Sequence, residues 1–214
     1  MAFGKPGRPS DDPLLRQREI YVAVSPLILA VGARRLSMRQ AAQAACLSVG
    51  GLYHHFATKQ DLVLHGIQPA TISRCCIDFH AGAAEFAHSN PPAYLEATLD
   101  FLTGMVGFIR PSVCAALELR LETLEATLAP TLAAANDEFS ATFRAAYPGA
   151  GTASVGQVGR ALHRALVAAL FDRTITPAEL RGELTALLNG YMALRQVPVP
   201  GIGAATWLES AAAG

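Results

Sequence analysis

Residues 37 to 59 (SMRQAAQAACLSVGGLYHHFATK) constrain the fold of this chain more than any other segment. Ser37 and Gln40 have the spacing of a capping box, in which both side chains satisfy backbone groups at a helix start. A helix is therefore predicted to begin near Met38, and its alanines allow a second helix to cross it closely. Cys46 lies in the short turn that follows. The pattern is typical of a helix-turn-helix.

The second helix of this motif is predicted to start after Ser48, a favourable N-cap residue. Leu52 and Phe56 are four residues apart, so we expect them to share its buried face. The opposite face is expected to carry Val49, Gly50, Gly51, Tyr53, His54 and His55. Such a face is suited to entering a DNA groove.

A third helix is predicted to follow Thr58, with Lys59 at its first position and Asp61 at its third. Free amides at a helix start favour anions, and Tyr53 and His55 can donate hydrogen bonds to phosphate oxygens on either side of a groove. We therefore expect binding to double-stranded DNA. The predicted contacts within the motif are Ser37, Arg39, Ser48, Val49, Gly50, Gly51, Tyr53, His54, His55 and Lys59.

The charges of the chain are unevenly divided, although its formal net charge is zero. Residues 1–66 contain eight Lys and Arg against four Asp and Glu, and residues 67–214 contain nine against thirteen. The basic part contains the motif, which suits attraction of a polyanion. Lys5 and Arg8 lie in a Pro- and Gly-rich arm that either places an arginine in a DNA minor groove or is an ordinary disordered terminus.

These features resemble the DNA-binding domain of the tetracycline-repressor (TetR) family over about residues 14 to 66. The resemblance rests on Gly32, Ser37-Met38-Arg39, Ala42, Ala45, Leu47-Ser48, Leu52-Tyr53-His54-His55-Phe56, Lys59 and Leu62. It implies an all-α homodimer whose recognition helices enter successive major grooves and whose C-terminal domain binds a small effector. It also implies ligand-responsive regulation of transcription, with repression at a palindromic operator as the first expectation.

Three features depart from the family pattern. Cys46 stands where the family usually has glycine, at a position that often needs a positive backbone angle, so the turn is expected to be either strained or differently shaped. Gly51 follows Gly50 where a small side chain is common, and each glycine weakens the helix by about 1 kcal/mol relative to alanine. Pro26 lies within an apolar run, so the first helix is expected to kink there or to begin later.

The composition also favours an all-α fold, since the chain is 51% hydrophobic with few aromatic residues, as expected of packed helices. The predicted organisation is a flexible basic arm (1–12), a helix-turn-helix domain (13–66), an effector-binding and dimerisation domain (67–196) and a C-terminal tail (197–214). A helix over 58–87 is expected to be interrupted at Pro69, either as a hinge or as a static break. Further helices are predicted over 92–109, 113–128, 130–147, 155–172 and 177–196.

The last two of these helices have clear start signals, Ser154 with Gln157 and Thr176 with Glu179. They are predicted to form an antiparallel hairpin, which the family resemblance assigns to the dimer interface. An intramolecular core is the alternative. The residues assigned to the interface are Val155, Val158, Leu162, Leu166, Leu184, Leu188 and Tyr191.

Bulky side chains beyond residue 70 suggest a lipophilic or aromatic effector. The candidate pocket residues are Phe79, Phe101, Met105, Phe108, Phe139, Phe143 and Phe171, with His80 and Arg120 as polar partners of the ligand. Ordinary core packing is the alternative for most of them.

Other classes of protein have weaker support. The sequence contains no nucleophile elbow, phosphate loop or zinc-binding His-Glu-x-x-His motif, so we expect neither enzymatic activity nor a cofactor. Cys46, Cys75, Cys76 and Cys114 have no metal-ligand or disulfide spacing and are expected to be reduced, with a thiol or metal sensor as the alternative. No signal peptide and no run of ~18 apolar residues is recognised, so a cytoplasmic protein is expected. A helical interaction module that has lost DNA binding is a further alternative.

Overall fold

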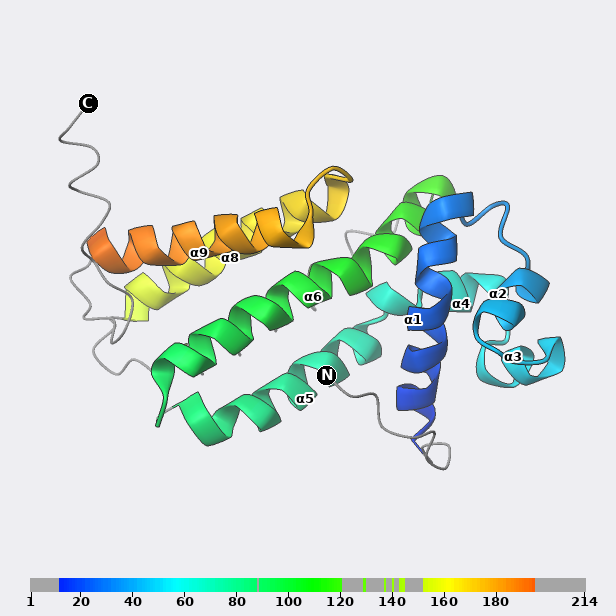
Figure 1. Cartoon of the computed structure of the whole chain (residues 1–214), viewed down its shortest axis with the longest axis horizontal. Helices are drawn as coiled ribbons and strands as arrows, with labels where there is room; N and C mark the ends of the chain where they lie inside the picture. The colour runs from blue at the N-terminus through cyan, green and yellow to red at the C-terminus, as the bar shows by residue number, and fades with distance from the viewer. Residues whose placement is uncertain are drawn as a thin grey trace. The chain divides into compact units, whose positions relative to one another are not determined.

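The computed structural model describes residues 12–87, 89–120, 129, 137, 140, 143–144 and 152–194. In this part of the chain the regular elements are α-helices and one short 3-10 helix (Figure 1). The predicted all-α fold is confirmed. The chain divides into two units, Met1–Ile72 with Phe108–Leu128, and Ser73–Gly107 with Ala129–Gly214.

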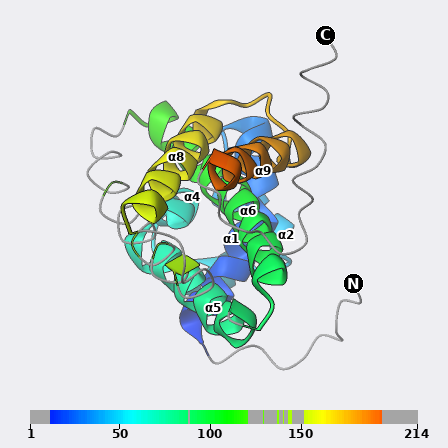
Figure 2. The same cartoon turned by 90° about the vertical axis from the view of Figure 1, so that its left-hand side faces the viewer.

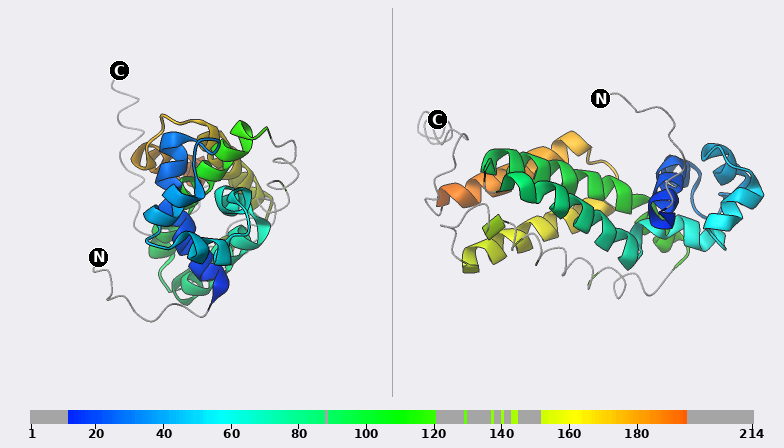
Figure 3. Two further views of the ribbon diagram at one scale, coloured as in Figure 1. Left: turned by 90° about the vertical axis from the view of Figure 1, so that its right-hand side faces the viewer. Right: turned by 90° about the horizontal axis from the view of Figure 1, so that it is seen from below.

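The first unit contains the helix-turn-helix. Its elements are α1 (Pro13–Val31), α2 (Met38–Ala44), α3 (Val49–His55), α4 (Lys59–Val63), the 3-10 helix η1 (His65–Ile67), the start of α5 (Pro69–Ala87) and the end of α6 (Pro91–Glu118). α2, α3 and α4 gather beside α1 (Figures 1 and 3). The buried core that they share consists of Ile20, Tyr21, Val24, Ile28, Ala33, Leu36, Ala41, Ala42, Leu52, Phe56, Leu62, Val63 and Ala115.

The starts of α2 and α4 follow the capping chemistry predicted from the sequence. Ser37 Oγ accepts the Gln40 backbone N–H at 3.3 Å, and Gln40 Oε1 accepts the Ser37 N–H at 3.0 Å. Thr58 and Asp61 form the same reciprocal box at α4. A cap of this kind contributes about 1 kcal/mol, so local sequence sets these boundaries.

α1 continues through Pro26 rather than beginning after it. Because proline has no N–H, the carbonyl of Val22 loses its usual helical donor. Ser25 Oγ donates to that carbonyl at 3.0 Å and takes the place of the missing N–H. A serine hydroxyl next to the proline therefore satisfies the carbonyl that the proline leaves open.

α6 corrects two predictions. Separate helices were predicted over 92–109 and 113–128, but Pro91–Glu118 is one helix with Pro111 inside it. Pro111 is buried, so we infer that tertiary packing outweighs the local cost of ~3 kcal/mol for a helical proline. α6 also has the length and apolar composition of a membrane span, contrary to expectation, although half of the window concerned is buried within the protein, as in a core helix.

A chain of buried hydrogen bonds joins α1, η1 and α6 within the first unit. Tyr21 Oη donates to the Phe108 carbonyl at 2.9 Å and lies 2.8 Å from Ser112 Oγ. Ser112 Oγ in turn accepts the Gly66 N–H at 2.9 Å. Because each hydroxyl has one proton, Ser112 donates to Tyr21. Burial raises the pKa of Tyr21, so the phenol keeps the proton that it donates.

Two glycines mark the points of closest approach in this unit. A Cβ at Gly66 would lie 2.5 Å from Tyr21 Oη and 2.8 Å from the Phe108 carbonyl oxygen. Gly32 has a φ of 81°, and its Cβ would lie 2.7 Å from Glu118 Oε1. A side chain at Gly66 would push apart elements that the hydrogen bonds hold together, whereas a side chain at Gly32 would be strained by the positive φ of that residue.

The second unit contains the predicted hairpin, formed by α8 (Thr152–Phe171) and α9 (Pro177–Leu194). The two helices lie side by side (Figures 1 and 2). Thr176 and Glu179 form the predicted capping box of α9. α8 begins earlier than predicted, so Ser154 lies inside the helix instead of capping it.

Two sets of contacts join the other helices of the second unit. The Phe79 and Phe101 rings stack with a centroid distance of 4.3 Å and an interplanar angle of 10°, which brings α5 against α6. Arg181 of α9 forms ion pairs with Glu96 and Asp100 of α6. These ion pairs are exposed to solvent, so we expect them to orient α9 more than to stabilise the fold.

His65 lies among aromatic rings in the core of the first unit. The residue is 1% exposed, and its ring centroid lies 5.6 Å from that of Tyr21 and 5.4 Å from that of Phe56. Thr71 Oγ1 lies 3.5 Å from both ring nitrogens. Burial lowers the pKa of His65 to about 4, so its ring is neutral in the folded protein near neutral pH.

We expect His65 to make the protein sensitive to mild acid. The unfolded chain binds a proton at a histidine at about pH 6.5, whereas the folded chain binds one at His65 only at a pH of about 4. The contribution of His65 is therefore fully present above the unfolded pKa and is lost as the pH falls toward the folded pKa, by up to about 1.4 kcal/mol per pH unit. Urea unfolding at several pH values should show this slope in the wild type and a smaller one in His65→Leu. Equal slopes would contradict the assignment.

Candidate nucleic-acid interface

α3 has one buried face and one exposed face. Leu52 and Phe56, which are 0% and 3% exposed, lie in the core of the first unit as predicted. Val49 and Tyr53 are 40% and 49% exposed and, being four residues apart, share the outward face. His54 is exposed as well. This outward face is available to a large ligand without any loss of core packing.

The first turn of α3 leaves open space beside Val49. Ser48 Oγ accepts the Gly51 N–H at 3.0 Å, which confirms Ser48 as the N-cap. A Cβ on Gly51 would lie 3.1 Å from that oxygen, whereas a Cβ on Gly50 would meet nothing within 4 Å. The absent side chain of Gly51 thus makes room for the cap. The absent side chain of Gly50 leaves a bare stretch of surface.

The turn between α2 and α3 has a positive backbone angle at Cys46, so it is the strained one of the two alternatives for this turn. The φ of this exposed residue is 55°, in a region that costs an L-residue about 1–2 kcal/mol. Two backbone hydrogen bonds hold the turn, from the Cys46 N–H to the Gln43 carbonyl at 3.1 Å and from the Leu47 N–H to the Ala42 carbonyl at 2.8 Å. Cys46 therefore adopts a backbone conformation that glycine adopts more readily, and the turn still forms.

Basic side chains lie around the start of α2. Arg34, Arg35 and Arg39 are exposed. Arg34 Nε donates to the Glu118 carbonyl at 2.8 Å, which holds this loop to the end of α6 within the first unit. Lys59 Nζ donates to the Arg34 carbonyl at 3.2 Å. Because an ammonium group has three donors, this bond leaves others for a phosphate.

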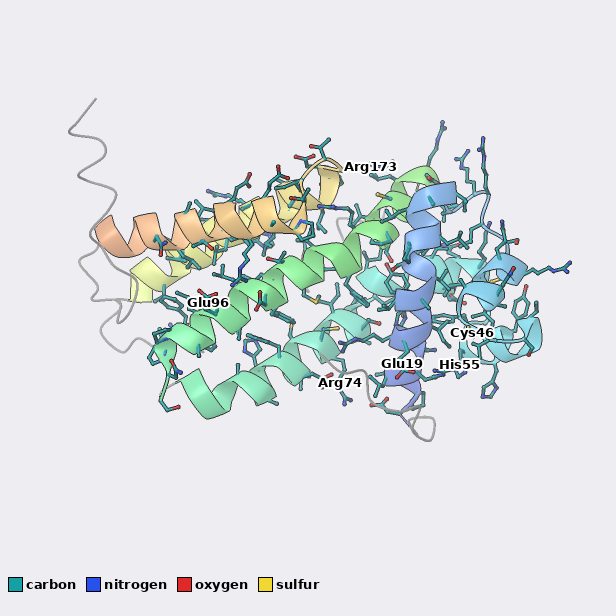
Figure 4. All side chains as sticks on the ribbon, in the orientation of Figure 1. Glu19, Cys46, His55, Arg74, Glu96 and Arg173 are labelled. Carbon is teal, nitrogen blue, oxygen red and sulfur yellow. The ribbon has the colours of Figure 1, made fainter. Side chains whose placement is uncertain are left out.

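Tyr53 and His55, predicted as a pair of phosphate donors, differ in their surroundings. Tyr53 is exposed, whereas His55 is partly buried and its carbonyl accepts a hydrogen bond from Gln17 Nε2 at 2.7 Å. Burial, together with the nearby His54 and Arg16, lowers the pKa of His55. His55, labelled in Figure 4, is therefore a neutral side chain near neutral pH. Tyr53 and His54 are the more accessible donors of this segment.

The remaining predicted DNA contacts are not all described. The Ser37 and Ser48 hydroxyls both serve as helix caps, so a direct role for them in DNA binding remains a prediction. Lys5 and Arg8 lie outside the described residues. The residues that combine exposure with suitable chemistry are Arg39, Val49, Gly50, Tyr53 and His54, beside the partly buried Lys59.

Part of the predicted effector pocket comes together in the second unit. His80 lies edge-on to Phe79 with a centroid distance of 5.2 Å, next to the stacked pair that Phe79 forms with Phe101. Met105 follows Phe101 by one helical turn and is partly buried, and Phe143 is 1% exposed. The aromatic layer between α5 and α6 is thus the best-defined part of this predicted site.

Three of the residues assigned to the pocket have other surroundings. Phe108 packs edge-on against Tyr21 in the first unit, with a centroid distance of 5.0 Å. Arg120 is exposed beyond the end of α6, with a φ of 55°. Phe171 is 52% exposed at the end of α8. Helical spacing alone did not indicate which face of each helix is buried. Phe139 lies outside the described residues.

Most of the residues assigned to the dimer interface are used inside the protomer. Val155, Val158, Leu162, Leu184 and Leu188 are at most 2% exposed, and Leu166 is partly buried. The Tyr191 side chain lies outside the described part of the structure. The outward surface of α9 instead carries Gly182, Ala186, Leu187 and Gly190. The buried residues of the assigned set, the buried stripe of the hairpin, therefore belong to an intramolecular core, which was the alternative to a dimer interface.

The cysteines do not form a cluster of metal ligands. Cys75 and Cys114 are buried, Cys76 is partly buried, Cys46 is exposed, and all four are free thiols. Among the residues that the structure describes, no group of three or more His, Cys, Asp or Glu side chains is arranged to hold a metal ion.

Residues 23–65 match a family model described as "Bacterial regulatory proteins, tetR family". The matched segment runs from the second half of α1 to η1 and includes the whole helix-turn-helix. A search of curated protein sequences found no match.

Several solved structures have a similar fold. A crystal structure of a protein described as a TetR-family transcriptional regulator, from Mesorhizobium loti, has a TM-score of 0.59 and 16% identity over 86% of this chain and 98% of that chain. A transcriptional regulator from Pseudomonas aeruginosa has a TM-score of 0.54 and 18% identity over 88% and 97% of the two chains. A TetR-family regulator from Streptomyces coelicolor has a TM-score of 0.50 and 18% identity over 84% and 81%. Residues 23–65 therefore match the tetR family of bacterial regulatory proteins, and the chain has the fold of solved structures described as transcriptional regulators of that kind.

Proposed function

We propose that this protein is a homodimeric, non-enzymatic repressor in the cytoplasm that binds a palindromic operator and is released by a small, apolar effector. The observation that carries the proposal is the division of α3 between a buried face, with Leu52 and Phe56, and an outward face, with Val49 and Tyr53. A helix held in this way can enter a major groove while the rest of the domain stays folded.

Binding would separate two kinds of contact. Arg39 and Lys59 are two of the positive charges near α2 and α3 and would bind phosphates, which sets the position of the domain on the duplex. The outward face of α3 would contact the base edges. In a two-fold symmetric dimer the two copies of α3 would enter major grooves one turn of DNA apart, about 34–36 Å.

Release would depend on the second unit. The stacked Phe79 and Phe101 rings, with His80 at their edge, offer an aromatic surface for an apolar effector that carries one polar group. α5 and α6 contribute residues to both units, so a ligand that shifts these helices would also act on the first unit. By linkage, DNA would weaken effector binding by the same factor as the effector weakens DNA binding.

The outward face of the hairpin supports dimerisation through α8 and α9. Gly182, Ala186 and Gly190 recur every fourth residue on the exposed side of α9, where they would let a second helix approach closely. Leu187 beside them is 41% exposed. We infer that this surface, and not the buried stripe of the hairpin, meets the second copy.

Leu187→Arg should convert the dimer to a monomer, because it places a charge in the centre of the proposed apolar interface. Sedimentation equilibrium at micromolar concentration measures the change in mass. Ile77→Arg is the matched control, since Ile77 is 63% exposed on α5 of the same unit and lies outside the proposed interface. A dimer that survives Leu187→Arg, or one that Ile77→Arg disrupts equally, would place the interface elsewhere.

Lys59→Ala and Arg39→Ala should weaken binding to all DNA sequences and flatten its salt dependence. Each substitution removes one phosphate contact per protomer, so the slope of log K against log salt for the dimer should become shallower by roughly 2. Fluorescence anisotropy with a selected operator measures this slope between low and moderate salt. Arg173→Ala, which removes the same charge from the second unit, should leave the slope unchanged.

Unchanged slopes in both Lys59→Ala and Arg39→Ala would contradict these phosphate contacts. If the wild type shows no saturable binding to DNA even at low salt, the proposed function is wrong. A helical interaction module that retains the fold would then be the better description.

A further inference from the structure

We infer that Val49 reads the 5-methyl group of a thymine in each operator half-site. The inference rests on the proposed function, because it assumes that the outward face of α3 lies in a major groove. It adds the chemical identity of one base that this face recognises.

The first turn of α3 cannot recognise bases by side-chain hydrogen bonds. Its residues are Val49, Gly50 and Gly51, and none of these side chains has a donor or an acceptor. Side-chain readout at this turn is therefore limited to van der Waals contact. Among the base edges in the major groove, the apolar group is the C5 methyl of thymine.

Val49 has the exposure and the rigidity that such a contact needs. Between residues 32 and 64, all of which are described, the large hydrophobic side chains that are exposed are Val49 at 40% and Tyr53 at 49%. Tyr53 ends in a hydroxyl, so Val49 offers the wholly apolar surface. A valine side chain in a helix is almost confined to one rotamer, so little conformational entropy is lost when it is buried against a base.

The surroundings of Val49 favour DNA as the occupant of this face over an apolar protein surface. Gly50, with nothing within 4 Å of a Cβ built on it, leaves room for a base edge to approach beside Val49. Arg35 and Arg39 are exposed at the start of the same helix-turn-helix, and Lys59 follows it. An apolar group within a basic region complements a methyl group in the groove of a polyanion.

The experiment removes single methyl groups from the DNA. An operator is first selected from random DNA with the purified full-length protein, and each thymine of both half-sites is then replaced in turn by deoxyuridine, which lacks only the 5-methyl group. At one thymine position the affinity of the wild type should fall about fourfold per half-site, the loss expected for one buried carbon. Val49→Ala should bind the unmodified operator several-fold more weakly and should lose less than twofold on the same replacement.

Val22→Ala is the matched control, since Val22 is 51% exposed on α1 of the same unit, and it should keep the full uracil effect. Circular dichroism should show that Val49→Ala remains folded, because alanine has a higher helix propensity than valine. If the wild type binds the operator but no thymine position shows a methyl effect that depends on Val49, the inference is overturned and the proposed function stands. If the protein selects no DNA at all, both are overturned.

Discussion

The packing of the first unit depends on the hydrogen bonds of the buried Tyr21 hydroxyl. It links α1 to the Phe108 carbonyl and to Ser112 of α6, and Ser112 binds the Gly66 N–H of η1. Segments nearly ninety positions apart in the chain thus share one run of hydrogen bonds. Loss of one partner would leave a buried polar group unsatisfied, at a cost of about 1–3 kcal/mol. This arrangement needs a glycine at position 66, because a Cβ there would collide with Tyr21 Oη and with the Phe108 carbonyl oxygen.

The helix-turn-helix is held to this framework at several points. Leu52 and Phe56 bury the inner face of α3 in the same core as Tyr21, and Arg34 ties the loop before α2 to the Glu118 carbonyl. Because the inner face is fixed by packing, the orientation of the outer face is fixed too. A rigid outer face favours selective binding to a groove, because little conformational entropy is lost on binding. The strained Cys46 turn is tolerated because the surrounding hydrogen bonds define it.

Local chemistry was readable from the sequence, whereas the packing of the helices was not. The caps at Ser37, Ser48, Thr58 and Thr176 and the buried face of α3 are each set by a few neighbouring residues, whereas the sequence left the shape of the turn at Cys46 open. The continuity of α6 through Pro111 and the exposure of Phe171 depend on contacts far along the chain. The same distinction explains why most of the residues assigned to the dimer interface are buried inside the protomer instead. Apolar residues at helical spacing indicate that a helix buries one face, but they do not indicate whether that face packs against the same chain or against a second copy.

The claim that the outer face of α3 lies against DNA is tested most directly by Gly50→Ala, measured for both stability and operator affinity. A Cβ there meets nothing within 4 Å, so the substitution should stabilise the folded protein by up to about 1 kcal/mol while it weakens operator binding. Gly104→Ala, at an equally open site on α6, should give the gain in stability without the loss of affinity. Operator affinity that is unchanged in Gly50→Ala would contradict the account.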